Sequence, residues 1–514
     1  MASTYVNDLR LNEMATGDAS GTWGTTTNTN LELISEKFGS GSEALSDAST
    51  ATITMADGAS DAFRSMALTL TGSLSQACTV TLAPNTLSNV WVVQNSAGNT
   101  VTLSQGTGAN VVIPNGSIKT VVADGAGAGA AVTDVLDMTG GTGNVGLGSG
   151  NLGTALTTGT DNVAIGEAAL DAVTTGSDNT VVGDNAGGAL TTGGNNVAVG
   201  SGALLVATTA AENTAVGTLA LTANSSGTDN TAVGYAAGDA VTTGSNNTFV
   251  GDNSGGATTT ADHNTAVGAS ALLVNSTGAS NVAVGKSALA ANTTASNNTA
   301  VGYLAGDAIT TGASNVAIGR DALGALTTVS DLTAVGREAL GANTTGTANT
   351  ALGRTALGAN TTGASNTAVG YLSLDANTTA SNNTAVGTST LTANTTGADN
   401  SALGMQALKD NTTGSYNVAV GKNSMEANTT GANNTALGRE SLASNTTADN
   451  NTAVGYNTLL ANTTGASNVA VGYLALDANT TANYITAVGE KALSANTTGA
   501  KNTALGRATL QAIT

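Results

Sequence analysis

The chain of 514 residues contains 67 glycines but only 2 prolines, 1 cysteine and 1 histidine, and aromatic side chains make up 3% of it. Only 9% of the residues are charged, and alanine and valine dominate the hydrophobic fraction, which argues against a multidomain enzyme with thick cores. The net charge of -20 argues against nucleic acid as a partner, because such binding needs clustered lysine and arginine. The lone thiol, Cys78, permits neither an intrachain disulfide framework nor a multi-cysteine metal site.

Residues 1–50 form the first segment of the chain, and they predict one short helix. Within residues 31–38, Leu31, Ile34 and Phe38 share one helical face, with Asn30 as the N-cap and Gly39 as the stop. The opening residues lack the basic start and the apolar run of a secretory signal. No stretch of about 18 apolar residues indicates a membrane span. We therefore expect neither export through a signal peptide nor membrane insertion.

Residues 51–138 predict a small antiparallel β domain. Alternating apolar and polar residues occur at 67–71, 79–82, 90–93 and 100–103, where threonine, valine and leucine predominate. Pro-Asn, Ala-Gly-Asn and Pro-Asn-Gly turns separate these stretches.

Residues 139–514 consist of one repeated unit. From Gly166 to Gly506 a glycine that closes an Asn-Thr-Ala-Val-Gly type of segment recurs every 17 residues without insertion or deletion, and Gly148 adds one more turn, which makes 22. Seventeen residues are too few for a helix pair, and the threonine, valine and glycine content opposes helix. The repeat therefore predicts an all-β fold, a β-solenoid or β-roll of 17-residue coils. At about 4.8 Å per coil it forms a shaft of roughly 100 Å.

The columns of the repeat predict which side chains face inward. We expect the Val, Ile or Leu before the repeat glycine, and the Leu four residues after it, to fill the interior. The alanine two residues before the glycine then points outward by strand alternation and contributes to contacts between chains. The repeat glycine itself indicates either a positive φ or a place without room for a Cβ atom.

Two columns of asparagine predict ladders of stacked amides along the solenoid axis. The first column comprises Asn343, Asn360, Asn377, Asn394, Asn411, Asn428, Asn445, Asn462, Asn479 and Asn496. The second runs from Asn162 to Asn502 and is interrupted by Leu332 and Ile485. The alternative is that asparagine merely suits the turns. A longer duplication lies over the 17-residue repeat, because Tyr235, Tyr303 and Tyr371 are each 68 residues apart, which is four turns.

The repeat, Asn-Thr-Ala-Val-Gly or Asn-Val-Ala-Val-Gly followed by Ala-Leu, resembles the head repeats of trimeric autotransporter adhesins and of phage tail fibres. Residues 21–34, Gly-Thr-Trp-Gly-Thr-Thr-Thr-Asn-Thr-Asn-Leu-Glu-Leu-Ile, are similar to a module at the start of phage tail-fibre proteins. The resemblance implies a parallel homotrimer located on the virion tail, outside the cell. It also implies attachment to other tail proteins through the first segment, for which we single out Trp23, Leu31, Ile34 and Phe38.

A phage tail fibre is favoured over a bacterial surface adhesin, because an adhesin is expected to carry a signal peptide and a C-terminal membrane anchor. A thin, alanine-rich coil gives an independent reason for a homotrimer, because little apolar surface is available to offset chain ordering. The structural and adhesive role implies a partner at the cell surface, such as a host glycan, or a separate tip protein. A shaft that only spaces its ends and a shaft that binds a receptor remain alternatives.

The position after each repeat glycine carries the bulky and charged side chains that could bind a glycan, since aromatic faces and planar guanidinium groups suit sugars. The candidate receptor-binding residues are Tyr235, Tyr303, Arg320, Arg337, Arg354, Tyr371, Arg439, Tyr456 and Tyr473. The alternative is a solubilising or inter-chain row, in which Asp321 and Glu338 neutralise the stacked arginines. We expect no enzyme, cofactor or metal site, because His263 lacks a nucleophile or a second ligand nearby in sequence. A polysaccharide-degrading tailspike is the weakest alternative.

Overall fold

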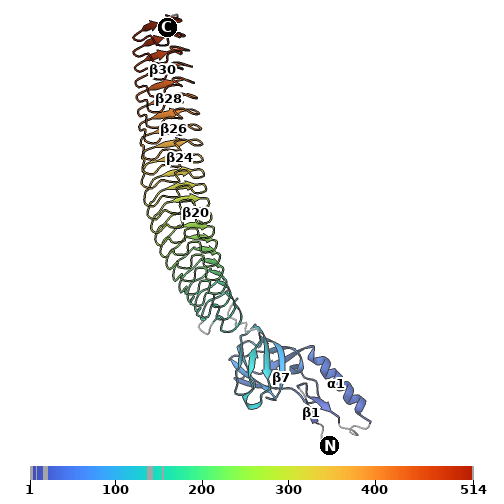
Figure 1. The fold of residues 1–514 in the computed structure, drawn as a ribbon. Coiled ribbons are helices and arrows are strands. Elements are labelled where there is room, and N and C mark those ends of the chain that lie inside the picture. Colours follow the sequence, from blue (N-terminus) through green and yellow to red (C-terminus); the bar gives the residue numbers. More distant parts are fainter. Residues whose placement is uncertain (1–3, 7, 15–20, 136–142, 153–155, 512–514) are drawn as a thin grey trace. The chain divides into compact units, whose positions relative to one another are not determined.

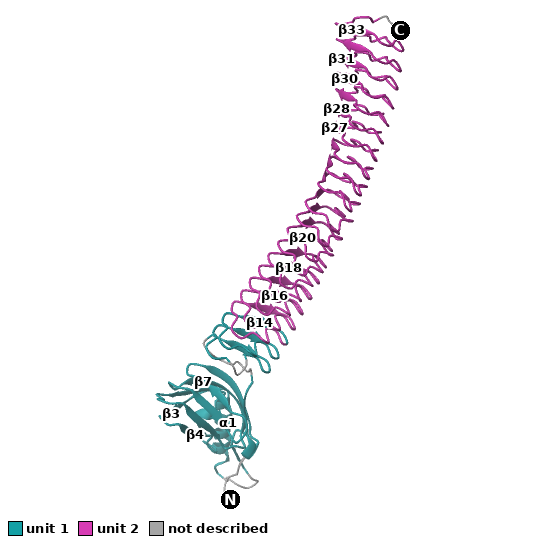
Figure 2. Cartoon of the chain, turned by 90° about the vertical axis from the view of Figure 1, so that its left-hand side faces the viewer, with its two compact units in different colours: residues 1–184 teal, residues 185–514 magenta. Residues whose placement is uncertain are grey.

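The computed structural model describes the chain except for residues 1–3, 7, 15–20, 136–142, 153–155 and 512–514, and it does not describe the side chains of residues 4–6. The chain divides into two compact units, Met1–Asp184 and Asn185–Thr514, which Figure 2 shows in different colours.

The first unit begins with a short hairpin and a helix. Strands β1 (Thr4–Val6) and β2 (Leu11–Glu13) pair antiparallel, and helix α1 spans Trp23–Lys37 with Thr22 and Phe38 as its caps. The helix was expected to start after Asn30, and this boundary is wrong. Asn30 lies inside the helix, where its side-chain amide donates to the Asn12 carbonyl and its Oδ1 accepts from the Asn12 N–H. The helix thus continues through the threonine-rich residues because its middle is tied to β2.

Two mixed sheets follow, and the strands from β3 to β8 alternate between them along the chain. The five-stranded sheet has the order β11-β10-β7-β5-β3 and comprises β3 (Ser40–Leu45), β5 (Ala67–Gly72), β7 (Ser88–Ser96), β10 (Ile118–Asp124) and β11 (Val132–Asp134). The four-stranded sheet has the order β4-β6-β8-β9 and comprises β4 (Thr50–Thr54), β6 (Cys78–Ala83), β8 (Val101–Ser104) and β9 (Val111–Ile113). Two 3₁₀ turns lie between these strands, η1 (Ala62–Arg64) before β5 and η2 (Gly127–Gly129) before β11.

The expected antiparallel pairing is present in β7–β10, β10–β11 and β8–β9. The pairs β3–β5, β5–β7, β4–β6 and β6–β8 are parallel, because consecutive strands enter opposite sheets and each sheet receives every second strand in the same direction. Alternate side chains of these strands form one buried core, in which Trp91 stacks on Phe63 with ring centroids 4.6 Å apart. The buried Cys78 belongs to this core, and burial raises the pKa of its thiol.

The repeats fold as the predicted solenoid, a parallel sheet of 22 strands in chain order. Its strands in the first unit are β12 (Val145–Leu147), β13 (Val163–Ile165) and β14 (Thr180–Val182). Those in the second unit are β15 (Val197–Val199), β16 (Thr214–Val216), β17 (Thr231–Val233), β18 (Thr248–Val250), β19 (Thr265–Val267), β20 (Val282–Val284), β21 (Thr299–Val301), β22 (Val316–Ile318), β23 (Thr333–Val335), β24 (Thr350–Leu352), β25 (Thr367–Val369), β26 (Thr384–Val386), β27 (Ser401–Leu403), β28 (Val418–Val420), β29 (Thr435–Leu437), β30 (Thr452–Val454), β31 (Val469–Val471), β32 (Thr486–Val488) and β33 (Thr503–Leu505). Figure 1 shows the coils of residues 185–514 stacked one upon another, each with one strand.

The assignment of inward and outward faces in the strands was wrong. The alanine two residues before the repeat glycine is buried in the coil, as for Ala351 and Ala368, whereas the Val, Ile or Leu before the glycine is partly or largely exposed. The large residue lies outside because Leu340 and Asn343, and their equivalents in other coils, already fill the interior. Only a methyl group fits beside them.

Phe249 supports this account of the interior. It occupies the alanine column of β18 and is fully buried. Gly238 and Gly255 stand where most coils have the inward leucine, and a Cβ atom on either glycine would lie 2.7 Å or 2.4 Å from the Phe249 ring. The large ring therefore takes the space of two missing side chains, so that the volume of the interior is conserved.

The repeat glycine satisfies both of the conditions that were proposed for it. Gly336 has a φ of +135°, and a Cβ atom on it would lie 2.4 Å from the carbonyl oxygen of Gly353 in the next coil. The inward leucine four residues later also has a positive φ, 50° at Leu340, which the sequence analysis did not anticipate. Glu338 and Ala348 in the same coil have positive φ as well, 60° and 54°. The coil therefore has four positions with positive φ, of which only the repeat glycine requires glycine.

Both asparagine ladders are confirmed. In the first column Asn360 donates from Nδ2 to Asn343 Oδ1 at 2.7 Å and to the Gly363 carbonyl at 3.0 Å. In the second column Asn366 donates from Nδ2 to Asn349 Oδ1 at 3.2 Å and from its backbone N–H to the same oxygen at 2.9 Å. At the interruptions the backbone N–H groups of Leu332 and Ile485 still donate to the preceding asparagine.

Candidate binding surfaces

An apolar stripe lies on helix α1. Trp23 and Phe38 are 67% and 75% exposed, and Leu31 and Ile34 are exposed as well. Their spacings of eight, three and four residues place all of them on one side of the helix. The residue that α1 buries is instead Leu33. The four residues singled out for attachment therefore lie together and are accessible to a partner.

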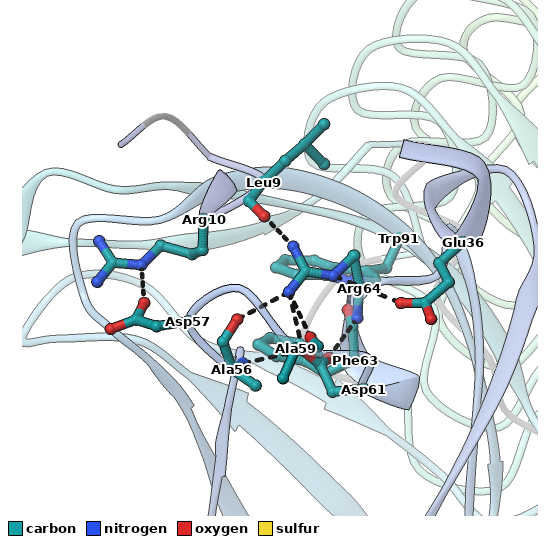
Figure 3. Close-up of polar contacts among 10 residues, drawn as sticks. All are labelled: Leu9, Arg10, Glu36, Ala56, Asp57, Ala59, Asp61, Phe63, Arg64 and Trp91. Carbon is teal, nitrogen blue, oxygen red and sulfur yellow. Dashed lines mark hydrogen bonds and ion pairs between the residues drawn. The ribbon is translucent and has the colours of Figure 1, made fainter. Parts of the chain in front are cut away.

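A buried arginine holds this part of the first unit together (Figure 3). The side chain of Arg64, in η1, is fully buried; its guanidinium donates to the carbonyls of Ala56 at 2.7 Å and Ala59 at 3.0 Å, and also to the carbonyl of Leu9. Its Nε lies 3.6 Å from a carboxylate oxygen of Glu36 in helix α1. The arginine thus connects the β1–β2 hairpin and the last turn of α1 to the sheets.

The row of tyrosine and arginine side chains in the second unit forms three clusters. Arg439 lies over the ring of Tyr456 at 5.6 Å, and Tyr456 stacks on Tyr473 with centroids 5.6 Å apart. Arg354 lies over the ring of Tyr371 at 5.4 Å. Tyr235 and Tyr303 are exposed and take part in none of these ring contacts.

The third cluster joins Arg320 and Arg337 to acidic neighbours. Arg320 pairs with Glu338 at 2.6 Å and with Asp321 at 3.4 Å, while Arg337 lies 3.6 Å from the other carboxylate oxygen of Glu338. The expected neutralisation is confirmed for Arg320 and Arg337, whereas Arg354 lies over the ring of Tyr371. These arginines are therefore engaged within the row.

A second stripe lies on the outer face of the solenoid sheet, where the sequence analysis placed the interior. It consists of the Val, Ile or Leu before each repeat glycine, together with the Thr, Val or Ser two residues earlier, and we call it the strand stripe. Leucines are its most exposed members: Leu352 is 47% and Leu403 is 50% exposed. From β15 to β33 neither column contains a charged residue. The stripe is thus a continuous uncharged surface that is one strand wide.

A groove of about 630 Å³ lies on the turns of four consecutive coils, away from the strand stripe. Its lining includes Asp321, Glu338 and Asp375. Burial, and then the charge of Glu338, raises the pKa of the Asp375 carboxyl group. This groove was not predicted from the sequence; Gly324, Gly341 and Gly358 line it.

Among the residues that the structure describes, no three or more of His, Cys, Asp and Glu gather as a metal site. His263 lies exposed on a turn with a φ of 59°. No helix in the described part of the chain has the length and apolar character needed to cross a membrane. The chain matches no protein-family model, and no match was found among curated proteins.

Proposed function

We propose that the protein is a structural and adhesive fibre component, a homotrimer whose first unit attaches to a particle, as in phage tail fibres, and whose solenoid extends toward a cell surface. The observation that carries the proposal is the strand stripe. An uncharged β-branched and leucine surface along a stack of solenoid coils is expected to be covered by another protein surface.

A further copy of the same chain fits the strand stripe for a geometric reason. The stripe repeats its side chains once per coil, at about 4.8 Å, and a partner must present complementary groups at the same spacing along the whole stack. A parallel copy in register has that spacing by construction. Three copies related by a rotation axis form a closed assembly that leaves no stripe uncovered.

The remaining surfaces suit the two kinds of contact that such a fibre makes. The exposed Trp23, Leu31, Ile34 and Phe38 offer an apolar helix face for a particle protein. The exposed rings of Tyr235, Tyr303, Tyr371 and Tyr473 offer flat faces for a surface glycan. Tyr456, which lies between Arg439 and Tyr473, offers the edge of its ring.

Covering of the strand stripe can be tested with single cysteines. Cys78 is buried, so a new thiol at Leu403 or at Thr413, which lies on an exposed turn, will dominate labelling by maleimide. We expect Leu403→Cys in the assembled protein to react at least about tenfold more slowly than Thr413→Cys. Equal labelling rates in the native protein contradict an interface at the stripe.

Adhesion can be tested with the assembled full chain on immobilised bacterial envelope polysaccharides. We expect binding that falls when Tyr456 and Tyr473 are both changed to alanine, because the two stacked rings form one aromatic surface. Absence of binding by a correctly assembled protein supports a spacer that carries a separate tip.

A further inference from the structure

Three successive coils lack a side chain at one position, and this opens the groove described above. Gly324, Gly341 and Gly358 each lie five residues after a repeat glycine, where other coils carry residues such as Leu205, Leu273 or Leu460. Ala342, Ala359 and Ala376 line the groove beside them. Over three coils its length is roughly 14 Å. The groove is therefore long and narrow.

Carboxylates surround this groove. Asp321 and Glu338 lie along it, and Asp375 closes one end, where its Oδ1 lies 3.0 Å from the position that a Cβ atom on Gly358 would take. At the other end Asp307 Oδ1 lies 3.9 Å from the corresponding position on Gly324. Arg320 and Arg337 pair with Asp321 and Glu338. Asp375 has no cationic partner within 4 Å among the described residues, so the groove keeps uncompensated negative charge.

The four-turn duplication provides an internal comparison. Sixty-eight residues earlier, the positions of Gly341 and Gly358 are occupied by Leu273 and Ala290, and those of Asp321 and Glu338 by Asn253 and Ser270. The aspartates at the ends are shared, since Asp239 and Asp307 precede Asp307 and Asp375 by the same interval. Gly324 corresponds to Gly256, so glycine is shared at that position. The block with the groove thus differs by the loss of two side chains and the gain of two carboxylates at the same place.

We propose that this groove binds a slender ligand that carries primary ammonium groups, as a linear polyamine or an oligosaccharide of amino sugars does. An ammonium group donates hydrogen bonds to a carboxylate and replaces the missing counter-charge at Asp375. The methyl groups of Ala342, Ala359 and Ala376 offer a flat apolar floor to methylene groups or to the face of a sugar ring. None of the lining residues belongs to the strand stripe.

The test is titration calorimetry of the full chain at low ionic strength with three probes: spermidine, the trimer of glucosamine and the trimer of N-acetylglucosamine. The last two share shape and hydroxyl groups but differ in the charge of the amino group. Gly341→Leu fills the groove, and Leu273 shows that a coil accommodates leucine at this position. Ala443→Leu adds the same side chain in the same column outside the groove and serves as the matched control. Asp375→Asn removes the end carboxylate.

We expect spermidine, the glucosamine trimer or both to bind, and which of them binds identifies the source of the ammonium group. The affinity is expected to fall at least about tenfold in Gly341→Leu and in Asp375→Asn and to remain unchanged in Ala443→Leu. Three results overturn the proposal: binding of neither ammonium probe, equal binding by Gly341→Leu, or equally tight binding of the acetylated trimer. Envelope binding through the tyrosine row is measured separately with the Tyr456 and Tyr473 variant, so failure of one idea does not imply failure of the other.

Discussion

Asn377 donates a hydrogen bond of 2.8 Å from Nδ2 to Oδ1 of Asn360 one coil earlier, and a second one of 3.1 Å to the carbonyl of Ala380 in its own coil. Both donors belong to one amide group that is fully buried. The same amide accepts from Asn394 with its oxygen at 3.0 Å. Each asparagine therefore fixes the coil before it, its own turn and the coil after it.

Asn377→Asp is expected to destabilise the solenoid more than Asn377→Leu. A carboxylate has no proton for Asn360 or Ala380, and its charge is buried against two acceptors, at a cost of about 3–5 kcal/mol. Leucine loses the hydrogen bonds but no charge is buried, and Leu326 occupies the same column in another coil, so about 1–2 kcal/mol is expected. Thermal unfolding together with hydrogen exchange of the neighbouring coils measures both. Equal stability of the two variants contradicts the ladder as a hydrogen-bonded device.

Phe249→Ala is expected to lower the unfolding free energy by about 3–5 kcal/mol, because the cavity lies between two glycines and cannot be filled by neighbours. Adding Gly238→Leu and Gly255→Leu to Phe249→Ala restores the arrangement of the other coils. The triple variant is expected to regain most of the loss. If Phe249→Ala alone is neutral in urea unfolding, the interior is not packed as described.

Arg64→Met is expected to cost about 3–5 kcal/mol of the stability of the first unit, because it leaves the partners of a buried charge unpaired. Arg10→Met is the matched control, since the Arg10–Asp57 pair at 2.6 Å is exposed and worth about 0–1 kcal/mol (Figure 3). Urea unfolding followed by the near-ultraviolet signal of the stacked Trp91 reports on both. A neutral Arg64→Met variant is incompatible with Arg64 as the link between hairpin, helix and sheets.

Acidification is expected to change the contributions of carboxylates to folding stability in opposite directions in the two units. Burial raises the pKa of Asp239, Asp307, Asp375 and Asp477 in the solenoid. A folded-state pKa above the unfolded value means that the folded state binds the proton more tightly, so stability rises as the pH falls through the folded-state pKa. In the first unit, hydrogen bonds to Asp47 from the backbone N–H and then from the hydroxyl of Ser75 lower the pKa of this carboxyl group. The stabilisation that these bonds give the folded state is lost as the pH falls and Asp47 takes up a proton.

Asp477→Asn isolates the solenoid side of this effect. The variant is expected to be more stable than the parent chain at neutral pH and equal to it below the unfolded-state pKa of aspartate, near 4. Melting temperatures of both proteins between pH 7 and pH 3.5 measure the difference. If the difference in melting temperature widens on acidification, folding does not raise the pKa of Asp477.

The sequence predicted the solenoid, both asparagine ladders and the pairing of Arg320 and Arg337 with acidic neighbours. These features follow from a strict 17-residue period, because residues in one column of stacked parallel strands must be neighbours. The faces of the strands could not be predicted in the same way. A strand of three residues is too short for its alternation to show which face is buried, and alanine and valine are both apolar. The inner face is decided by Leu340 and Asn343, which fill the coil and leave room only for the alanine.

The candidate sites were predictable only in part. Trp23, Leu31, Ile34 and Phe38 lie on one exposed face, although the helix starts at Trp23 rather than after Asn30. The groove was not predicted, since it results from glycines 17 residues apart whose effect appears only when their coils are stacked. The departure of Gly341 and Glu338 from the four-turn duplication was a signal within the sequence that could have found it.

Charge placed in the strand stripe is expected to weaken assembly. Leu403→Lys with Leu437→Lys inserts two ammonium groups per chain into the apolar surface and is expected to raise the dissociation constant at least about tenfold, because each charge is buried without a partner. Thr413→Lys with Thr447→Lys places the same charges on exposed turns and is the control. Sedimentation over a dilution series measures both. Equal dissociation of the two double variants places the contacts elsewhere.

The account rests on several copies of this chain covering one another's strand stripes, and the mass of the intact full-length protein under native conditions tests this most directly. With a chain mass of 49.4 kDa, we expect a single species at three times that value, which persists on dilution. A protein that remains monomeric at micromolar concentration, with its stripe open to solvent, contradicts the proposed fibre.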